Sequence, residues 1–394
     1  MKKIGFSGTL DPITNGHMWV ISEARSMADE VLVFISENPF KNCQFSAIKR
    51  KQIIEMSATQ RGWCNITVVV VRGDYTARVA KNHGVDYLVR GIRNTSDFDY
   101  ENLIQQTNVD VLNGAKTIFV MPPRDLGSVS STFIRALQGP VGWHWLTKKF
   151  VPAPAYEAWI RDWLRNEWTQ LWKCESPDTQ TLERSAYWFD FLTGENSYGS
   201  TQRQYHNLDH LVHGLTEIKV WAENCNASTE DVNTLKKAFW FHDAVYAEHQ
   251  KDMSDEEASA QLWLESCLDI DNAEGPASLI RATDHFQQLS IQHPLKDILL
   301  GADLAILGQN QDIYDIYAHA IRAEYHYIPT ELFNANRIRA LKQLCEKANS
   351  QQLYQNEYFA SQYNAKAIDN MTREIEFLSS GGFSTQKADE HDKN

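Results

Sequence analysis

The spacing of apolar residues divides the chain into two parts. From residue 1 to about 150, short β-branched runs alternate with stretches of helical periodicity, a pattern typical of βαβ units with a parallel sheet. We therefore expect an open, five-stranded parallel α/β domain of the Rossmann-like kind, which binds ligands where its strands end, after Ser7, Ser36, Arg90 and Met121. The expected strands are 3–7, 31–36, 66–72, 87–90 and 117–121, and the expected helices lie near 17–28, 47–58, 76–83, 100–112 and 131–138.

The second part shows only helical periodicity. The segment Pro152-Ala153-Pro154 carries two prolines, which predicts an interruption of regular structure and a seam between domains. Beyond it, a tryptophan stripe from residue 156 to 172 predicts a packed core or domain-interface helix rather than a ligand platform. Further helical stripes cover 208–222, 232–246, 254–268 and 312–327. We expect domains at 1–155 and 156–382, the second all-helical, and a loose polar tail at 383–394.

Composition and charge exclude several classes of protein. Apolar residues make up 43% and charged residues 23% of the 394 residues, as in ordinary globular proteins. The net charge of −13 argues against a nucleic-acid partner. No apolar run is long enough to cross a membrane, and no secretory segment follows Lys2-Lys3, so we expect a cytoplasmic protein without a membrane partner. The six cysteines form no C-x-x-C pair and are interpreted as reduced, mostly core thiols.

The first expected strand leads into a loop suited to phosphate binding. Gly8 lets the chain turn, Asp11-Pro12 fixes a bend, and Gly16 leaves room for a phosphate at the start of the next helix. His17 would then lie at a helix N-terminus and could donate a hydrogen bond to an α-phosphate as charge develops there. Taken alone, the same residues fit an ordinary loop with a capping histidine.

Three other stretches follow strands of the same expected sheet: 38–41, 90–101 and 128–135. Taken singly, Lys41 is interpreted as a surface lysine, and the serines near residue 130 are interpreted as a helix cap. Together they bring cations and hydrogen-bond donors to the same edge as His17. This convergence predicts a nucleotide-phosphate site.

On these motifs, residues 1 to about 155 resemble the phosphopantetheine adenylyltransferases of the nucleotidylyltransferase superfamily. The resemblance implies that 4′-phosphopantetheine attacks the α-phosphorus of ATP, assisted by Mg²⁺, and gives dephospho-coenzyme A and pyrophosphate. It implies catalytic roles for His17, Lys41 and Arg90, and phosphopantetheine binding by Thr9, Lys41, Thr76 and Arg90. The implied ATP-binding residues are Thr9, Leu10, His17, Gly91, Ile92, Arg93, Glu101, Leu126, Gly127, Ser128, Val129, Ser130, Ser131 and Thr132.

Two departures from that family concern the adenosine side. Leu10 stands where the family usually has phenylalanine, and 126–129 replaces a usual aromatic-Ser-Phe-Ile run. The run 130–135 also resembles nicotinamide mononucleotide adenylyltransferases, which makes that mononucleotide the rival substrate. The stretch 89–101 favours phosphopantetheine. Stand-alone members of the family form hexamers, so a homo-oligomer is considered, although the second half of the chain could block those contacts.

The helical half carries a second set of chemical residues. His210, the pair His242-Asp243 and Asp303 follow one another along the chain. A His-Asp pair within an apolar helix is costly to bury unless it has a partner, and a divalent cation supplies one. We interpret His210, His242, Asp243 and Asp303 as ligands of Mn²⁺, Fe²⁺ or Mg²⁺.

Residues 190 to 360 resemble predicted metal-dependent phosphohydrolases of the HD superfamily, in particular in 241–246 and 302–308. The resemblance implies an all-helical HD domain and a metal but no particular substrate; the fusion points to a nucleotide, including those related to coenzyme A. A nucleotide-sensing regulatory module is the alternative.

Three neighbouring features stay open at this level. His206 could be a ligand, a phosphate contact or a donor behind the ligands, and we place it outside the ligand set. His285 could complete a second metal position or be structural. The acidic run 255–257 is read as a solvated helix start.

Overall fold

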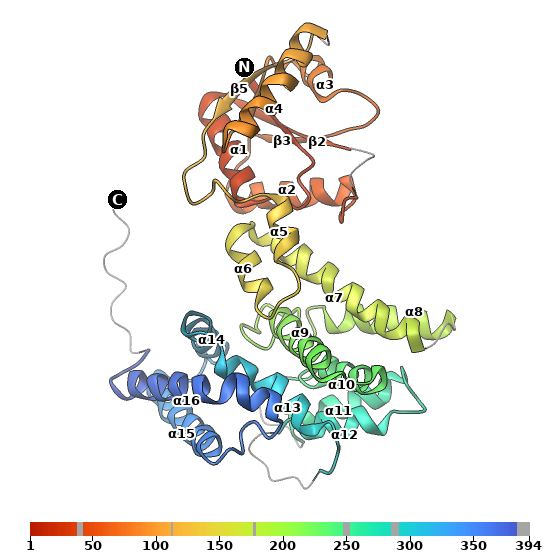
Figure 1. Ribbon diagram of the computed structural model, residues 1–394, viewed down its shortest axis with the longest axis vertical. Helices are drawn as coiled ribbons and strands as arrows, with labels where there is room; N and C mark the ends of the chain where they lie inside the picture. Colours follow the sequence, from red (N-terminus) through yellow and green to blue (C-terminus); the bar gives the residue numbers. More distant parts are fainter. Residues whose placement is uncertain (38–41, 112, 176–178, 247–252, 285–290, 384–394) are drawn as a thin grey trace. The chain divides into compact units, whose positions relative to one another are not determined.

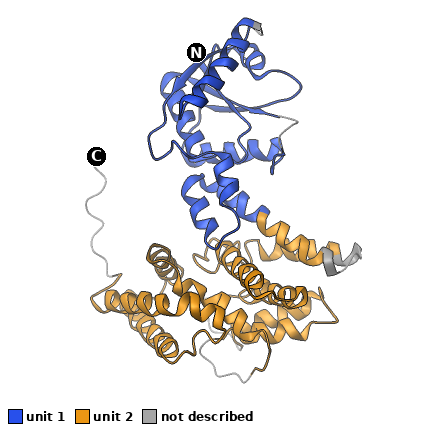
Figure 2. Cartoon of the chain, in the orientation of Figure 1, with its two compact units in different colours: residues 1–162 blue, residues 163–394 orange. Residues whose placement is uncertain are grey.

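A computed structural model describes residues 1–37, 42–111, 113–175, 179–246, 253–284 and 291–383. The chain forms two compact units, 1–162 and 163–394, which are described separately below (Figure 2). The division falls inside helix α7 (Ala153–Glu175), as does the sequence-based boundary at 155/156. The interruption at the two prolines is shorter than expected, because Pro154 lies in the first turn of α7, where a missing N–H is tolerated.

The N-terminal unit, drawn from red to yellow in Figure 1, contains the predicted five-stranded parallel sheet. Its strands follow one another in the order β3-β2-β1-β4-β5. This confirms the Rossmann-like fold class. The elements before α7 are β1 (Lys3–Gly8), α1 (Asn15–Met27), β2 (Glu30–Ser36), α2 (Ala47–Gln60), β3 (Ile66–Val71), α3 (Thr76–Asn82), β4 (Tyr87–Gly91), α4 (Thr95–Gln106), η1 (Thr107–Val111), β5 (Lys116–Val120), α5 (Ser131–Leu137) and α6 (Trp143–Phe150).

The strand order creates a topological switch point at β1. This strand pairs with β2 on one side and with β4 on the other. The chain leaves neighbouring strands in opposite directions at such a point, which opens a crevice beyond their C-terminal ends. A ligand site is therefore expected beyond Gly8 of β1 and Gly91 of β4.

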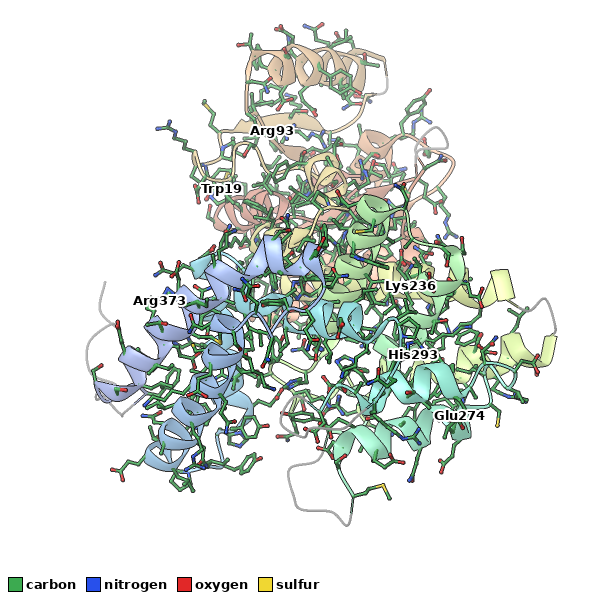
Figure 3. All side chains as sticks on the ribbon, turned by 60° about the horizontal axis from the view of Figure 1, so that its bottom comes forward. Trp19, Arg93, Lys236, Glu274, His293 and Arg373 are labelled. Carbon is green, nitrogen blue, oxygen red and sulfur yellow. The ribbon has the colours of Figure 1, made fainter. Side chains whose placement is uncertain are left out.

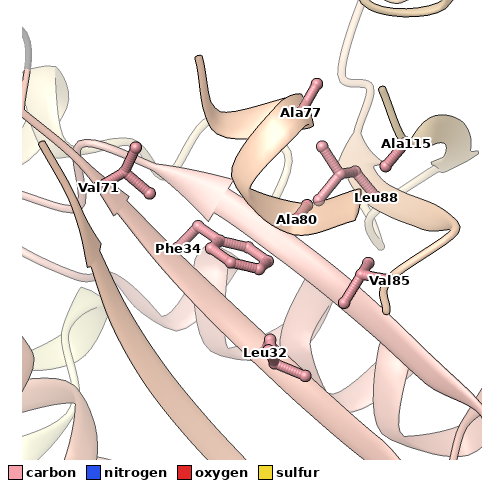
Figure 4. Packing of buried hydrophobic residues seen from close by; sticks show 8 residues of the cluster. All are labelled: Leu32, Phe34, Val71, Ala77, Ala80, Val85, Leu88 and Ala115. Atoms are coloured by element: carbon pink, nitrogen blue, oxygen red, sulfur yellow. The ribbon is translucent and has the colours of Figure 1, made fainter. Parts of the chain in front are cut away.

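The sheet core follows from the alternation of side chains along each strand. Leu32 and Phe34 of β2 point to one face, where Ala77 and Ala80 of α3 pack against them (Figure 4). Small side chains on α3 let the helix approach the sheet closely. The cluster consists of Leu32, Phe34, Val71, Ala77, Ala80, Val85, Leu88 and Ala115.

Helix α4 begins earlier than its apolar pattern indicates. The expected range was 100–112, but the helix starts at Thr95 because the Asn94 side chain accepts the N–H of Asp97 and caps it. The C-terminal part continues as the π-helical η1. The short helix α6 had not been predicted from the sequence.

The C-terminal unit is all-helical in its described residues, as predicted. Helix α9 packs against α10 and α13, and α10 also packs against α13. The elements after α7 are α8 (Thr179–Leu192), α9 (Leu208–Cys225), α10 (Thr229–Phe241), α11 (Asp255–Ser266), α12 (Glu274–Arg281), α13 (Lys296–Leu304), η2 (Ala305–Gly308), α14 (Gln311–Glu324), α15 (Thr330–Asn349) and α16 (Glu357–Ser379).

The tryptophan stripe of α7 forms core, as expected. The Trp168 ring centroid lies 4.8 Å from that of Trp240 and 5.4 Å from that of Trp172. All three side chains are buried. The stripe therefore packs helices together and is not a ligand platform.

The interpretation of the cysteines as mostly core thiols was wrong for the described ones. Cys64, Cys225 and Cys267 are exposed, and Cys43 and Cys345 are half-buried, although all five are free. Cys267 caps the end of α11 in a left-handed conformation, and Cys225 is the last residue of α9, so both lie at helix ends where apolar periodicity no longer applies. No helix within the described ranges is long and apolar enough to span a membrane. The tail expected at 383–394 lies outside the described residues except for Phe383.

Candidate functional site

A cavity of about 500 Å³ opens beyond the C-terminal ends of β1 and β4, the edge expected from the strand order. It brings together residues from four separate stretches of chain. The predicted site residues that line it are Thr9, Leu10, His17, Arg90, Gly91, Arg93, Glu101, Leu126, Val129, Ser130, Ser131 and Thr132.

Other predicted site residues do not line this cavity. Ile92 is buried, and Gly127 and Ser128 lie in the loop before α5. Thr76 begins α3, and its Oγ1 lies 3.0 Å from Oγ of Ser36. Lys41 lies outside the described residues.

His17 is the third residue of α1 and closes a capping box with Thr14. The backbone N–H of Thr14 donates to its Nδ1 at 3.0 Å. Because Nδ1 accepts this bond, the neutral ring carries its proton on Nε2. His17 therefore takes both of the roles considered from the sequence. It caps helix α1, and it also lines the cavity with a hydrogen-bond donor available.

Burial is the main reason that the pKa of His17 is lowered from its usual 6.5 to about 4, and the charges of Arg90 and Arg93 add to the effect. The imidazole is thus neutral at neutral pH. Arg93, which is labelled in Figure 3, is itself held by Asp97, whose Oδ2 lies 2.8 Å from Nε.

Arg90 is fixed at the cavity wall by the end of β1 and by α4. Its Nε donates to Oε2 of Glu101 at 2.9 Å, and its two terminal nitrogens donate to Glu101 and to the backbone carbonyl of Ser7. The paired guanidinium is held in one orientation by a nearly buried carboxylate. Glu101, predicted from the resemblance as an ATP contact, thus holds Arg90.

Asp11 has a structural role that the sequence reading did not include. Its buried carboxylate accepts the backbone N–H groups of Gln44 at 2.7 Å and Phe45 at 3.1 Å. Its carbonyl oxygen accepts a bond from Arg135 at 2.5 Å. Asp11 therefore joins its own loop to the loop before α2 and to helix α5, a function that depends on residues more than 30 positions away and leaves no local signal.

Gly16 allows the loop before α5 to approach α1. A β-carbon at this position would lie 3.1 Å from the carbonyl oxygen of Val129. The loop continues into Ser130, which caps α5 by accepting the N–H of Phe133, and into Ser131, which donates to the Pro12 carbonyl at 2.8 Å. Ser130 therefore caps α5 and also lines the cavity, as does the neighbouring Ser131.

This geometry, a parallel sheet with a histidine at the first helix N-terminus and arginines around a switch-point cavity, defines the class of nucleotide-binding transferase domains. Residues 6–137 match the cytidylyltransferase-like family. The domain is therefore a nucleotidyltransferase domain.

Individual proteins are similar to this chain over the same N-terminal region. The chain is 36% identical to phosphopantetheine adenylyltransferase of Chromobacterium violaceum over 156 residues, which cover 40% of this chain and 94% of that protein. It is 34% identical to the Neisseria meningitidis protein of the same name over 39% of this chain and 88% of the relative. The corresponding values for the Streptococcus suis protein are 38%, 34% and 83%. Through its N-terminal unit the chain belongs to the phosphopantetheine adenylyltransferase family.

In the C-terminal unit, the predicted ligands come from three helices that pack together. His210 lies in the first turn of α9, His242 is the C-cap of α10, and Asp303 lies near the end of α13. The Nε2 atoms of the two histidines are 3.0 Å apart, and Oδ1 of Asp303 lies 3.4 and 3.5 Å from them. These three side chains form a group that could hold a metal ion.

Asp243 also approaches this group. Its Oδ2 lies 3.0 Å from Nε2 of His242 and 3.4 Å from Nε2 of His210. The helical stripe expected at 232–246 was too long, because α10 ends at Phe241 and the His-Asp pair lies at its C-terminal end and not inside a helix. This end position lets both neighbouring side chains turn toward one point.

The donor set fits a divalent cation. Nδ1 of His242 lies 2.8 Å from the Phe239 carbonyl oxygen, so its proton is committed there and Nε2 faces the carboxylates. Nitrogen and carboxylate ligands together suit Mn²⁺, Fe²⁺ or Mg²⁺.

The charges in the group interact strongly. Burial lowers the pKa of His210. At His242 burial acts in the same direction, but the carboxylates of Asp243 and Asp303 outweigh it and raise the pKa well above its usual value. At Asp243 burial would raise the pKa, but the neighbouring His242 charge outweighs it and holds the pKa well below its usual range.

His206 is not part of this group and pairs with Glu324 of α14: its Nδ1 lies 2.5 Å from Oε1 of Glu324. Burial opposes the charged imidazole, yet the Glu324 carboxylate outweighs it and raises the pKa of His206. The acidic run 255–257 starts α11 after the Ser254 cap, as expected, and Glu257 forms a salt bridge with Arg281. His285 lies outside the described residues.

Proposed function

We propose that the N-terminal unit transfers the adenylyl group of ATP to 4′-phosphopantetheine, giving dephospho-coenzyme A and pyrophosphate. The observation that carries this proposal is the neutral, oriented imidazole of His17 in a cavity that also contains Arg90 and Arg93. The similarity to proteins named phosphopantetheine adenylyltransferase supports this choice of acceptor substrate.

In this proposal the phosphate of phosphopantetheine attacks the α-phosphorus directly, and no covalent enzyme intermediate forms. Nε2–H of His17 donates to an α-phosphate oxygen as negative charge develops, and Arg90 with Lys41 holds the attacking phosphate. ATP is bound by the stretches around Thr9, Gly91 and 126–132, with Mg²⁺ supplying charge neutralisation on its phosphates.

The substrate is tested by incubating the purified chain with ATP and Mg²⁺ and either 4′-phosphopantetheine or nicotinamide mononucleotide. Pyrophosphate release together with dephospho-coenzyme A is expected only with the first acceptor. Release with the mononucleotide alone would replace the proposed substrate by the rival that 130–135 resembles.

The catalytic role of His17 is tested with His17→Asn. We expect kcat to fall by about 10²–10³-fold, the usual cost of removing one donor to a developing charge. His83→Asn is the matched control, since His83 is an exposed histidine of the same unit that does not line the cavity. An unchanged transfer rate in His17→Asn would exclude the role.

We also propose that the C-terminal unit is a metal-dependent phosphohydrolase of the HD type that acts on a nucleotide. The convergence of His210, His242 and Asp303, with Asp243 beside them, supports this. When bound there, the metal would polarise a phosphoryl oxygen and activate water.

A screen of nucleotides and coenzyme A intermediates with Mn²⁺, Fe²⁺ and Mg²⁺ tests this second proposal. Turnover that is lost in Asp243→Ala favours a hydrolase. Tight nucleotide binding without any product would favour the regulatory alternative, in which this unit senses a nucleotide and controls the transferase.

A further inference from the structure

The loop between β2 and α2 supplies part of the wall of the cavity of about 500 Å³ in the N-terminal unit. Asn42 and Cys43 of this loop line the cavity together with Thr9. The described residues 42–46 form no helix or strand, so their position depends on side chains that reach them from other elements. Those side chains can control how the loop meets a substrate.

The strand order decides which substrate this loop faces. In the sheet, β1 lies between β2 on one side and β4 on the other. The stretches proposed to bind ATP at Gly91 and 126–132 follow β4 and β5, whereas the loop 42–46 follows β2. The loop therefore borders the β2 side of the cavity, away from these ATP-binding stretches, which is the side proposed for the acceptor.

Arg50 of α2 holds this loop and the loop after β1 at the same time. Its Nε donates to the Phe45 carbonyl oxygen at 3.1 Å, and its Nη1 donates to the Thr9 carbonyl oxygen. Arg50 is only 3% exposed. Burying a guanidinium is costly unless its donors are used, and here two of them fix the spacing between the two loops.

Helix α7 holds the same loop from another element. Oδ2 of Asp162 accepts a side-chain N–H of Gln44 at 2.8 Å. The Phe45 ring meets the Trp159 ring edge-on with centroids 5.9 Å apart, and both side chains are buried. Both α7 residues belong to the N-terminal unit, although the sequence-based boundary placed them in the helical domain, and they lie beyond the stretch that matches the cytidylyltransferase-like family.

We propose that Arg50 and Asp162 are positioning residues of adenylyl transfer, which hold the loop 42–46 where its cavity-facing residues bind 4′-phosphopantetheine. Neither residue lines the cavity itself. This inference rests on the proposed transferase function and goes beyond it, because it makes part of α7 necessary for binding the acceptor. Arg50 acts on both loops, whereas the bond from Gln44 to Asp162 acts on the loop 42–46 alone.

The test of Asp162 compares the two Michaelis constants of the full chain with ATP, Mg²⁺ and 4′-phosphopantetheine. In Asp162→Ala, KM for 4′-phosphopantetheine should rise about 3–10-fold, the equivalent of one ordinary hydrogen bond, while KM for ATP and kcat stay at their wild-type values. Asp162→Asn keeps an oxygen that can accept from Gln44 and should recover most of the loss. Glu157→Gln changes an exposed carboxylate of the same helix and is the control.

The test of Arg50 has a different expected pattern. Arg50→Met removes both carbonyl bonds, so KM should rise for both substrates because Thr9 also loses its support. The expected fall in kcat/KM is about 10²-fold, the effect of a small misplacement of groups that bind the reactants. Arg50→Lys keeps one donor group and should give an intermediate value. Lys49→Met, at the neighbouring exposed position of α2, is the control.

Alkylation of Cys43 reports on the loop without any transfer reaction. Cys43 belongs to the loop and is half-buried, whereas Cys64 is exposed in the same unit. Native protein is treated with iodoacetamide, and the cysteine peptides are quantified by mass spectrometry. Modification of Cys43 should be faster in Asp162→Ala and in Arg50→Met than in the wild type, with the rate at Cys64 as the internal reference.

The outcomes separate this inference from the function on which it rests. Wild-type protein that transfers no adenylyl group to 4′-phosphopantetheine would overturn the transferase proposal and this inference together. In an active protein, an unchanged KM for the acceptor in Asp162→Ala, or an equal rise for both substrates, would overturn the role of Asp162 alone. Should Arg50→Met fail to fold, Arg50→Lys takes its place, and unchanged KM values for both substrates in that variant would overturn the role of Arg50.

Discussion

Gly214 of α9 lies directly against the ring of Phe239 of α10, so close that a β-carbon on Gly214 would be 1.9 Å from Cζ of the ring. Gly214 follows His210 by one turn, and Phe239 precedes His242 by one turn. The contact therefore sets the distance between the two helices where they present their histidines.

Gly214→Ala should accordingly disturb the metal-ligand group without touching it. The alanine forces the helices apart or moves the Phe239 ring, at a cost of about 1–3 kcal/mol or more in the free energy of unfolding. We expect a lower melting temperature and weaker Mn²⁺ binding by calorimetry. Gly275→Ala is the control, because its β-carbon would come no closer than 3.8 Å to a neighbour. Equal metal affinity in both variants would show that this spacing does not control the site.

Asp303→Asn should abolish stable metal binding while the fold persists. The change removes a charged oxygen that lies 3.4 Å from His210 and 3.5 Å from His242, and an amide is a weaker ligand for a hard cation. Elemental analysis after dialysis against metal-free buffer measures the effect. Asp297→Asn changes a carboxylate in the first turn of the same helix α13 and should keep the wild-type metal content; a variant at 303 that also keeps it would remove this residue from the ligand set.

The fold of the N-terminal unit follows from local pattern. Runs such as Val31 to Ile35 and Ile66 to Val71 are short and rich in β-branched residues, and helical spacing separates them, so a parallel sheet was predictable. The predicted helix ends were wrong where the apolar pattern does not determine them. Capping by Asn94 starts α4 earlier than the pattern indicates, and α10 ends at Phe241 although its apolar pattern continues.

The site residues were predictable where they lie at strand ends or next to one another in the sequence. Thr9 and Arg90 follow or end strands, and such ends meet at one edge of a parallel sheet. Pairs such as Asp11 with Phe45 or His206 with Glu324 depend on segments 34 and 118 residues apart. Their partners appear only when the helices have packed, which no local spacing encodes.

The protonation of His17 gives a pH prediction for the N-terminal unit. Its pKa is lowered from 6.5 to about 4 in the folded protein, so the unfolded chain binds more protons between these values. The contribution of His17 to stability is therefore fully present above about pH 6.5 and falls as the pH is lowered toward about 4. Hence this imidazole should cause no loss of transfer rate between pH 8 and pH 6.

Carbon-13 NMR of histidine-labelled protein measures this directly. The resonance missing in His17→Asn should titrate near pH 4, and the one missing in His83→Asn provides a comparison from an exposed histidine of the same unit. A His17 resonance that titrates near pH 6.5 would contradict the burial and charge environment described for the cavity.

Asp11→Asn should loosen the loop that follows β2. The buried carboxylate accepts two backbone N–H groups, at 2.7 Å from Gln44 and 3.1 Å from Phe45, and an asparagine amide nitrogen would face one of these donors instead of accepting from it. Leaving that donor unsatisfied costs about 1–3 kcal/mol. Hydrogen exchange followed by mass spectrometry should show faster exchange in the peptide that contains Gln44 and Phe45, with a higher KM for the substrates bound beside this loop.

Asp29→Asn is the matched change, since this exposed carboxylate also accepts a backbone N–H, that of Lys2. Faster exchange at Gln44 and Phe45 in both variants would mean a general loss of stability, and unchanged exchange in Asp11→Asn would show that the loop is held by other contacts.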